Sequence, residues 1–338
     1  MYAVAVFQRR RLKNSPYAGA ICIRGGIFMK RKRKLVPLEL QKRYDKLLDI
    51  APELATVQDV QRSLDIVKAH TNAEGFNALG YALTNVFEGA WLKDAKTIYE
   101  FDKTLFETLS DQTDLSVASD TLKRLPFRCA YICMPVKLTG PQDTPMDGFF
   151  ALKKEDAIKC LFVSTDTMAF GQLDIHLSAK TFEESEELSV EEAKGYGAEF
   201  VRSPNSNTTR ASKLIVQLLL YLCAANADIK ERRPTATQTK KTSKTTNKRP
   251  VRHWDVGIRV GATIKRNRSY AAQTQQHRSG EHKQHARPRP HLRRGHWSHF
   301  WVGKRDSKDR ERILKWIEPT YINADSPDNL PTTIHKVK

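Results

Sequence analysis

FRCAYICM, at residues 127–134, is the first of four short apolar runs that decide the fold of this chain. The other three are GFFAL (148–152), CLFVS (160–164) and LDIHL (173–177). Each run has the length of a β-strand, and proline and glycine residues separate the runs. The pattern predicts a small, mainly antiparallel β-sheet.

Residues with helical spacing precede these runs. Apolar side chains recur at that spacing from Pro37 onward, and Pro37 itself suits a first helical turn. A second amphipathic helix is expected over residues 57–70, with Thr56 as its N-cap. A third is expected over residues 73–88, broken or bent at Gly80.

A second helical part follows the strand runs. Residues 189–196 restart a helix, and LIVQLLLYLCAANA at 214–227 is the longest apolar run. This run is too short to cross a bilayer and contains Gln217 and Asn226, so it predicts a buried core helix. The fold class is therefore α+β, with a helical N-terminal part, the sheet, and a basic β-containing C-terminal domain.

Charge divides the chain into three blocks within a formal net charge of +19. Residues 1–34 hold about 10 basic and no acidic residues, residues 35–227 sum to roughly −8, and residues 228–338 to roughly +17. A charge spread evenly for solubility would not be sorted in this way. The basic C-terminal third predicts a polyanionic partner, because Lys and Arg release counterions from phosphates.

Composition also suggests domain boundaries. Residues 1–34 predict a basic, disordered tail, 35–230 an α+β body, and 231–250 (ERRPTATQTKKTSKTTNKRP) a flexible linker. The basic C-terminal domain then covers 251–338, with an internal Gln/His-rich loop at 273–290. Within that domain the sequence predicts a short strand or hairpin over residues 253–264 and two further strands over residues 296–303 and 313–322.

The densest constellation of candidate binding residues lies in PRPHLRRGHWSHFWVGKR at 288–305. Arginine pairs with phosphate and stacks on bases, and indole rings offer stacking platforms for single-stranded nucleic acid. An alternative, compatible with this one, is that Trp297 and Trp301 fill a core, since both share one strand face with His299. The predicted nucleic-acid-binding residues are Arg287, Arg289, His291, Arg293, Arg294, His296, Trp297, His299, Trp301, Lys304 and Arg305.

The sequence contains little that indicates a catalytic or metal-binding site. The three histidines of that segment have no Asp or Glu between residues 283 and 304, and Cys129 and Cys133 lack a second ligand pair at zinc spacing. Asp174 and His176 share a strand face, but no nuclease or hydrolase motif accompanies them. The sequence predicts no catalytic residue, no metal and no cofactor.

The expected location is the cytoplasm of a bacterial host cell. The five cysteines are sparse and odd in number, which suits free thiols in a reducing compartment. No apolar run is long enough to span a membrane, and Arg24 interrupts the only apolar patch near the N-terminus, which argues against a signal peptide. Translation from Met29 instead of Met1 stays open.

RPHLRRGHWSHFWVG at 289–303, followed by Lys315, Trp316 and Pro319, resembles a block in the type V-A anti-CRISPR family of phages and plasmids. Weaker similarities, such as LPFRCAY at 125–131 and LLLYLCAANADI at 218–229, extend the resemblance over most of the chain from about residue 38. The family includes a protein that blocks biosynthesis of the type V CRISPR effector nuclease.

The resemblance implies a function. A member of this family would recognise the nascent N-terminal peptide of the nuclease at the translating ribosome and promote loss of its messenger RNA. The implied partners are RNA rather than DNA, the ribosome and that peptide, and no membrane. The N-terminus, the linker and the Gln/His-rich insert depart from the family pattern, which leaves the target open. The alternatives are a general RNA- or DNA-binding phage or plasmid protein without peptide recognition, and an unrecognised nuclease.

Overall fold

The structure is a computed structural model of the 338-residue chain. It describes residues 5–6, 35–73, 75–112, 115, 117, 119–139, 145–163, 170–195, 207–233, 250–278, 291–305 and 310–322. Most of the N-terminal tail, residues 234–249 of the predicted linker and residues 279–290 of the Gln/His-rich stretch lie outside these described residues.

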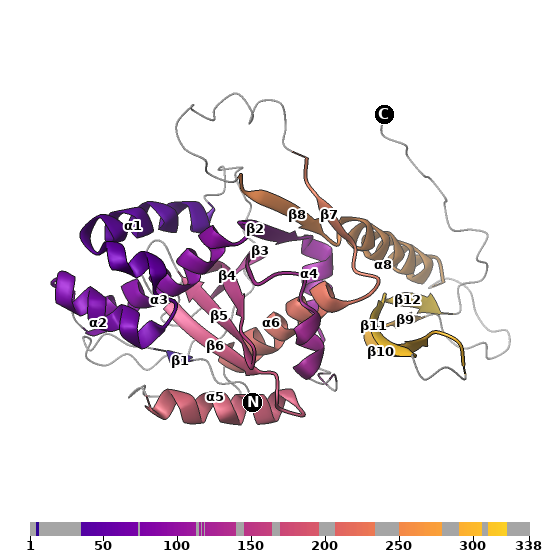
Figure 1. The fold of residues 1–338 in the computed structure, drawn as a ribbon. Coiled ribbons are helices and arrows are strands. Elements are labelled where there is room, and N and C mark those ends of the chain that lie inside the picture. Colours follow the sequence, from indigo (N-terminus) through magenta and orange to yellow (C-terminus); the bar gives the residue numbers. More distant parts are fainter. Residues whose placement is uncertain are drawn as a thin grey trace, which may run out of the picture.

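An eight-stranded mixed sheet forms the centre of the described part (Figure 1). Its strand order is β1-β6-β5-β4-β3-β2-β8-β7. Strand β2 is parallel to both β3 and β8, while the other neighbours are antiparallel. The strands are β1 (Ala5–Val6), β2 (Thr97–Phe101), β3 (Cys129–Thr139), β4 (Pro145–Lys153), β5 (Ala157–Val163), β6 (Phe170–His176), β7 (Ile229–Glu231) and β8 (Arg252–Val256).

The α+β class is confirmed, but the expectation of a small antiparallel sheet is wrong. The four apolar runs supply β3 to β6 as predicted from their length. The sheet is larger because β2, β7 and β8 extend it beyond β3, and β2 brings parallel pairing. These three strands are short and come from distant parts of the sequence, so local patterns did not reveal that they pair.

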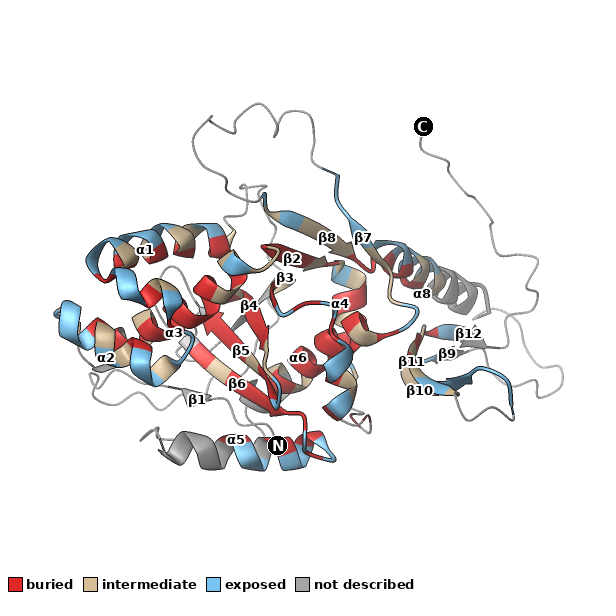
Figure 2. Ribbon diagram, viewed as in Figure 1, coloured by how far each residue is buried: buried red, intermediate tan, exposed pale blue. Residues whose placement is uncertain are grey.

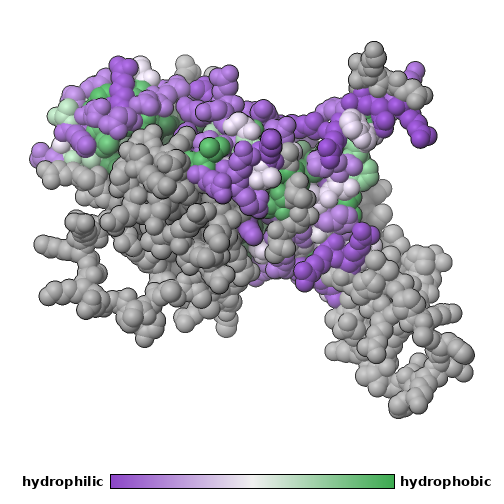
Figure 3. Space-filling view, turned by 90° about the horizontal axis from the view of Figure 1, so that it is seen from below, coloured by the Kyte–Doolittle hydropathy of each residue, from purple (hydrophilic) through white to green (hydrophobic). Residues whose placement is uncertain are grey.

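The apolar runs are continuous because the sheet is buried on both faces. In β3, Ala130 and Ile132 face one core cluster, and Cys129 and Tyr131 face another. Figure 2 shows the central strands buried between helices whose outer faces are exposed. Where described residues are visible from below, the surface is mostly hydrophilic, as expected when apolar side chains are used in the cores (Figure 3).

Helices cover both faces of the sheet. On the first face, α1 and α3 pack through Leu40 and Trp91. On the second face, α4, α6 and α8 pack through Leu105, Leu219 and Val260. The helices are α1 (Val36–Ile50), α2 (Val60–His70), α3 (Gly75–Lys93), α4 (Lys103–Ser110), α5 (Phe182–Gly195), α6 (Asn207–Cys223) and α8 (Ile258–Arg278), with short 3₁₀ turns η1 (Pro52–Thr56) and η2 (Ser119–Arg124). No helix in the described ranges is long and apolar enough to cross a membrane.

Three helix boundaries differ from the sequence predictions. Thr56 is not an N-cap: it ends η1, and the Asp59 carboxylate caps α2 by accepting from the Arg62 N–H at 2.8 Å. Helix α3 runs through Gly80 without a break. Helix α5 begins at Phe182, seven residues before the expected restart at Ser189. The first difference follows from the competing cap at Asp59, which a local pattern does not rank against Thr56.

Of the short strand or hairpin predicted over residues 253–264, a strand forms as β8, but the hairpin is wrong, because β8 leads directly into helix α8. Gly257 makes the turn with φ of 77°, and a Cβ there would lie 2.0 Å from the Leu105 side chain. The Asp228 carboxylate then caps α8 by accepting from the N–H groups of Arg259, at 2.7 Å, and Val260, at 3.3 Å. The first part of the expected Gln/His-rich loop, residues 273–278, belongs to this helix.

The described residues do not pack as a body and a separate C-terminal domain divided at residue 250. Strand β8 lies between β2 and β7 in the main sheet, and Leu314 and Trp316 lie in the main core cluster. The first predicted C-terminal strand forms as β10 (His296–Val302), whereas the one predicted over residues 313–322 divides into β11 (Glu311–Ile317) and β12 (Thr320–Ile322). A second small pair joins β9 (His291–Arg293) to β12 (Thr320–Ile322).

Candidate nucleic-acid interface

Most of the predicted binding residues lie on or beside the antiparallel hairpin β10–β11 (Figure 1). Arg287 and Arg289 lie outside the described residues, as does the side chain of His291 on β9. Arg293, Arg294, Lys304 and Arg305 are exposed, and His296, Trp297 and His299 are half-buried. The hairpin and the adjoining β9 therefore bring the eight remaining predicted residues together, but these residues differ in exposure.

One half of the hairpin is anchored to helix α6. The Trp297 and Trp316 rings pack at 5.0 Å between centroids, and Trp316 is 2% exposed. The Trp297 indole N–H donates to the Gln217 side-chain oxygen at 2.6 Å. The core-packing interpretation of Trp297 is thus correct, and Trp297 packs at the edge of the main cluster.

Asn226, just after α6, holds the partner strand. Its side-chain N–H donates to the Trp316 carbonyl at 2.8 Å, and its side-chain oxygen accepts from the Trp316 N–H at 3.0 Å. The Ala225 N–H also donates to the Leu314 carbonyl at 2.8 Å. Gln217 and Asn226, the two polar residues in the apolar run, are therefore the hairpin's attachment points. Sequence reasoning noticed both residues but gave them no partner.

Gly295 belongs to the same attachment. A Cβ at this position would lie 2.5 Å from the Trp316 ring, so a side chain would displace the indole. The glycine in RRGHW is explained by this close approach of the backbone to the ring.

The other half of the hairpin extends away from α6 and is exposed. Phe300 is 40% exposed, Trp301 60% and Val302 49%. Because side chains alternate along a strand, Phe300 and Trp301 lie on opposite faces. We call these three residues, with the cations beside them, the aromatic tip.

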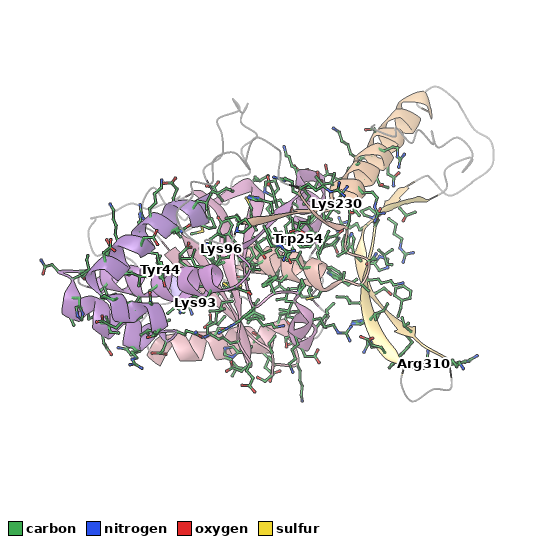
Figure 4. All side chains as sticks on the ribbon, turned by 45° about the horizontal axis from the view of Figure 1, so that its top comes forward. Tyr44, Lys93, Lys96, Lys230, Trp254 and Arg310 are labelled. Atoms are coloured by element: carbon green, nitrogen blue, oxygen red, sulfur yellow. The ribbon has the colours of Figure 1, made fainter. Side chains whose placement is uncertain are left out.

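Each exposed ring of the aromatic tip has a cation over it. The Arg310 guanidinium carbon lies 5.2 Å from the Trp301 ring centre, and the Lys315 ammonium lies 5.2 Å from that of Phe300. Figure 4 shows Arg310 at the far end of the hairpin from the sheet. Sequence reasoning missed Arg310 and Lys315, which lie just before and within β11, next to the predicted residues on β10. An exposed ring beside a cation suits a base and its phosphate.

His296 and His299 do not form a site with each other, because three residues apart on a strand they face opposite sides. Burial lowers the pKa of His299 from its ordinary value, and the positive charges of Arg312 and Arg124 lower it further, against a smaller opposing effect of Asp120. His299 is therefore held as the neutral imidazole on the inner face of the hairpin. In the described part of the chain, no three His, Cys, Asp or Glu side chains gather as metal ligands.

The remaining reactive candidates are occupied by structural contacts. Asp174 accepts from Lys159 at 2.8 Å and from Gln172 at 2.9 Å. Cys129 and Cys160 are fully buried, and burial raises the pKa of each thiol well above its ordinary value. Neither group has the exposure or activation of a catalytic nucleophile.

Sequence reasoning missed a buried carboxyl group, Glu88 on α3, which is 0% exposed and has no hydrogen-bond partner among the described residues. Burial raises its pKa well above the ordinary value, and the negative charge of Asp45 adds to the effect, while Lys96 opposes it. Tyr44 and Lys96 lie in the same part of the molecule (Figure 4). The burial of Glu88 inside the helical layer therefore shifts its pKa in the direction that favours the neutral acid.

Comparisons with known proteins match a family model, a curated relative and a solved structure of similar fold. The family described as AcrVA2-like, anti-CRISPR type V subtype A2, matches residues 99–324. Protein FinQ of Escherichia coli is 33% identical over 126 residues, and this alignment covers 35% of each of the two proteins. The chain thus matches about a third of FinQ's length. The crystal structure of AcrVA2 shares the fold with a TM-score of 0.53 at 18% identity, over 85% of this chain and 97% of that one.

Proposed function

Because the chain belongs to the anti-CRISPR type V subtype A2 family, we propose that it suppresses production of a type V CRISPR effector nuclease during its translation. In this proposal the protein recognises the nascent N-terminal peptide of the nuclease and promotes loss of the nuclease's messenger RNA. The matched range, residues 99–324, includes both the central sheet and the hairpin β10–β11.

The observation that carries the RNA part of the proposal is the aromatic tip. Burial of aromatic rings stabilises a folded chain, and Trp301, at 60% exposure, is not used in this way. Its ring is therefore available to another partner. Bases stack on such rings, while Arg305, Arg310 and Lys315 supply charge for phosphates. RNA is the favoured nucleic acid because a translating ribosome offers single-stranded message.

Both contacts are needed on one chain for a physical reason. A modest affinity for a nascent peptide is raised when the same protein already holds RNA close to the ribosome, because the second contact then becomes intramolecular. The expected effect is an avidity that exceeds either contact alone. A protein that held RNA without recognising the peptide is the competing account, and the experiment below separates the two.

The experiment uses two altered target genes in cells that carry the protein. One gene is recoded with synonymous codons over its first part, and the other encodes changed N-terminal residues with as few nucleotide changes as possible. We expect the synonymous message to remain suppressed and the changed peptide to escape, measured as messenger RNA and protein levels. The opposite result would assign recognition to RNA sequence and support the plain RNA-binding account.

The protein variants in this experiment should be point substitutions. A deletion of residues 251–338 would remove β8 from the middle of the sheet and so would test folding. Trp301→Ala together with Arg310→Ala alters only the exposed tip and should weaken suppression. Lys42→Ala together with Lys46→Ala, on the exposed surface of α1, is the matched control and should leave suppression unchanged.

A further inference from the structure

A groove runs along the open edge of the sheet, where β7 is the last strand and the first turns of α8 form a wall. Its volume is about 1050 Å³. Figure 4 labels Lys230 at this end of the sheet, close to the start of α8. We call it the edge groove; it is lined by Ala227, Asp228, Ile229, Lys230, Glu231, Arg232, Arg233, Asp255, Ile258, Arg259 and Ala262.

The backbone of β7 has hydrogen-bonding groups on the side of this groove that have no partner among the described residues. Strand β7 pairs with β8 in antiparallel register, with Lys230 opposite Asp255. The Gly257 N–H donates to the Asp228 carbonyl at 2.7 Å, and the Arg232 N–H donates to the His253 carbonyl at 2.8 Å. Antiparallel pairs alternate between bonded and non-bonded, so Lys230 is the bonded residue between these two.

Ile229 and Glu231 therefore direct their N–H and C=O groups away from β8, toward the open edge. Two donors and two acceptors on alternate residues match the backbone of one added strand. A nucleic acid offers no such alternation of amide donors and acceptors. The groove lining also contains no aromatic ring on which a base could stack.

The acidic side chains of the groove are already engaged within the protein. Asp255 pairs with Arg232, which also contacts Glu100 at 3.0 Å. Glu231 pairs with Arg252 at 2.7 Å. These contacts neutralise Arg232 and Arg252, so they do not supply charge to a ligand.

Other cations in and beside the groove have no close ion pair with a described residue. Lys230 and Arg233 make no ion pair with any described residue. The Arg259 side chain is 81% exposed, and its contact with Asp228 is long, at 3.7 Å. Arg266, two turns further along the same face of α8, is also exposed. The unused charge of the edge groove is therefore positive.

We propose that the edge groove accepts an extended peptide with acidic side chains, which adds to β7 as a ninth strand of the sheet. The unused amide groups of Ile229 and Glu231 would hold its backbone, and Lys230, Arg233 and Arg259 its carboxylates. Two other occupants fit less well. Residues 234–249 contain four Lys, one Arg and no acidic residue, and a second copy of β7 would bring the unused positive charges of two edge grooves together.

This inference deepens the proposed function, on which it rests only for the source of the peptide. The two can fail separately. If acidic peptides bind the groove but changing the N-terminus of the nuclease does not relieve suppression, the proposed peptide recognition is wrong and the edge groove stands. If suppression depends on that N-terminus but groove variants suppress normally, the edge groove is wrong and the proposed function stands.

The experiment measures binding of fluorescent ten-residue peptides to the full chain by anisotropy. Four peptides are compared. The first alternates Thr or Val with Glu, and the second replaces each Glu by Lys. The third and fourth are the Glu peptide N-methylated at alternate residues, one along each of the two hydrogen-bonding edges of the peptide strand. We expect the Glu peptide to bind, the Lys peptide to bind at least about tenfold more weakly, and one of the two N-methylated forms to lose about tenfold.

Variants and hydrogen exchange locate the site. Lys230→Glu with Arg233→Glu and Arg259→Glu should lower the affinity about tenfold or more, while Lys46→Glu on α1 should not change it. Peptide binding should slow amide exchange at Ile229 and Glu231 and leave Lys230 unchanged, because the Lys230 N–H is already bonded to β8.

Three outcomes would overturn the inference. The first is equal binding of both N-methylated forms and the parent peptide, which would show that charge alone acts. The second is a single-stranded oligonucleotide that binds competitively with the peptide and protects the groove more strongly, which would assign the groove to nucleic acid. The third is dimerisation of the chain with protection of the same two amides, which would assign it to a second copy.

Discussion

The two ends of the hairpin β10–β11 each carry a tryptophan on β10, but one tryptophan is packed against the core and the other is exposed. Trp297 and Trp301 share one strand face, four residues apart, yet Trp297 donates to Gln217 and packs on Trp316 while Trp301 is 60% exposed. The difference lies in α6: its end and the residues after it reach one half of the hairpin and not the other. A strand pattern alone therefore does not separate a core tryptophan from a binding tryptophan, whereas its partners do.

The largest effect should come from the anchored end. Trp316→Ala removes a buried indole and the ring against which Trp297 packs, so the free energy of unfolding should fall by about 3–5 kcal/mol. Urea denaturation followed by circular dichroism measures this change. Trp301→Ala is the matched control, and we expect it to change the stability by less than about 0.5 kcal/mol. Equal losses for the two variants would break the comparison.

The contact between Trp297 and Gln217 should come next. Gln217→Leu leaves the Trp297 indole N–H without its acceptor, at a cost of about 1–3 kcal/mol. Trp297→Phe in the same background removes the unsatisfied donor, so part of the loss should be recovered. A double-mutant cycle on unfolding free energies tests this, and purely additive effects would contradict a direct bond.

The exposed end should matter for RNA and not for stability. Trp301→Ala should weaken binding of a labelled single-stranded RNA by about 1–3 kcal/mol, the usual contribution of one stacked base. Fluorescence anisotropy at fixed salt measures the affinity. Phe300→Ala probes the opposite face of the hairpin, and a loss confined to one of the two would show which face the RNA follows.

Phosphate contacts should show a smaller effect per residue and a characteristic salt dependence. Replacing Arg293 and Arg294 with Ala should reduce the slope of log affinity against log salt by about 0.7 for each phosphate of single-stranded RNA that the variant no longer neutralises. The same measurement on Lys42→Ala with Lys46→Ala should give the slope of the unaltered protein. A binding constant independent of salt would show that the protein does not bind RNA through its phosphates.

The smallest effect concerns His299 on the inner face of the hairpin. Its pKa in the folded protein is lowered, so its neutral form stabilises the fold. This contribution is fully present above the ordinary histidine pKa of about 6.5 and is lost as pH falls toward the lowered value. Titration by NMR should give a midpoint below 6.5, and Arg124→Ala should move it upward. A midpoint above 6.5 would contradict the burial of His299.

The sequence predicted those parts of the fold that local patterns determine. The runs that became β3 to β6, the core helix α6 and both strands of the hairpin could be recognised from length and composition. The sequence also marked Gln217 and Asn226 as unusual, but their partners Trp297 and Trp316 lie far along the chain. The contacts of the half-buried Arg310 and Lys315 with exposed rings depend on strand register, which the sequence did not supply.

The errors share a physical cause. Residues 253–264 read as a hairpin because Gly257 and Gly261 interrupt the apolar pattern, but Gly257 makes a turn against Leu105 and Gly261 lies inside α8, close to Asp102. The boundary placed at residue 250 relied on a change in charge. Charge describes the surface of a chain, whereas β8 joins the sheet through backbone pairing and the buried Val256.

The position of β8 has a consequence for how the protein itself is made. Strand β2 emerges early in synthesis, but β8, its parallel neighbour, follows only after nearly half of the chain has been added. Until then β2 is an unprotected edge, and unprotected edges pair with other chains. Such distant pairing is also slow to form, since a long loop must close first. Messages truncated before the codon for Arg252 should therefore yield aggregating chains, and the complete chain should reach its native state in a late step.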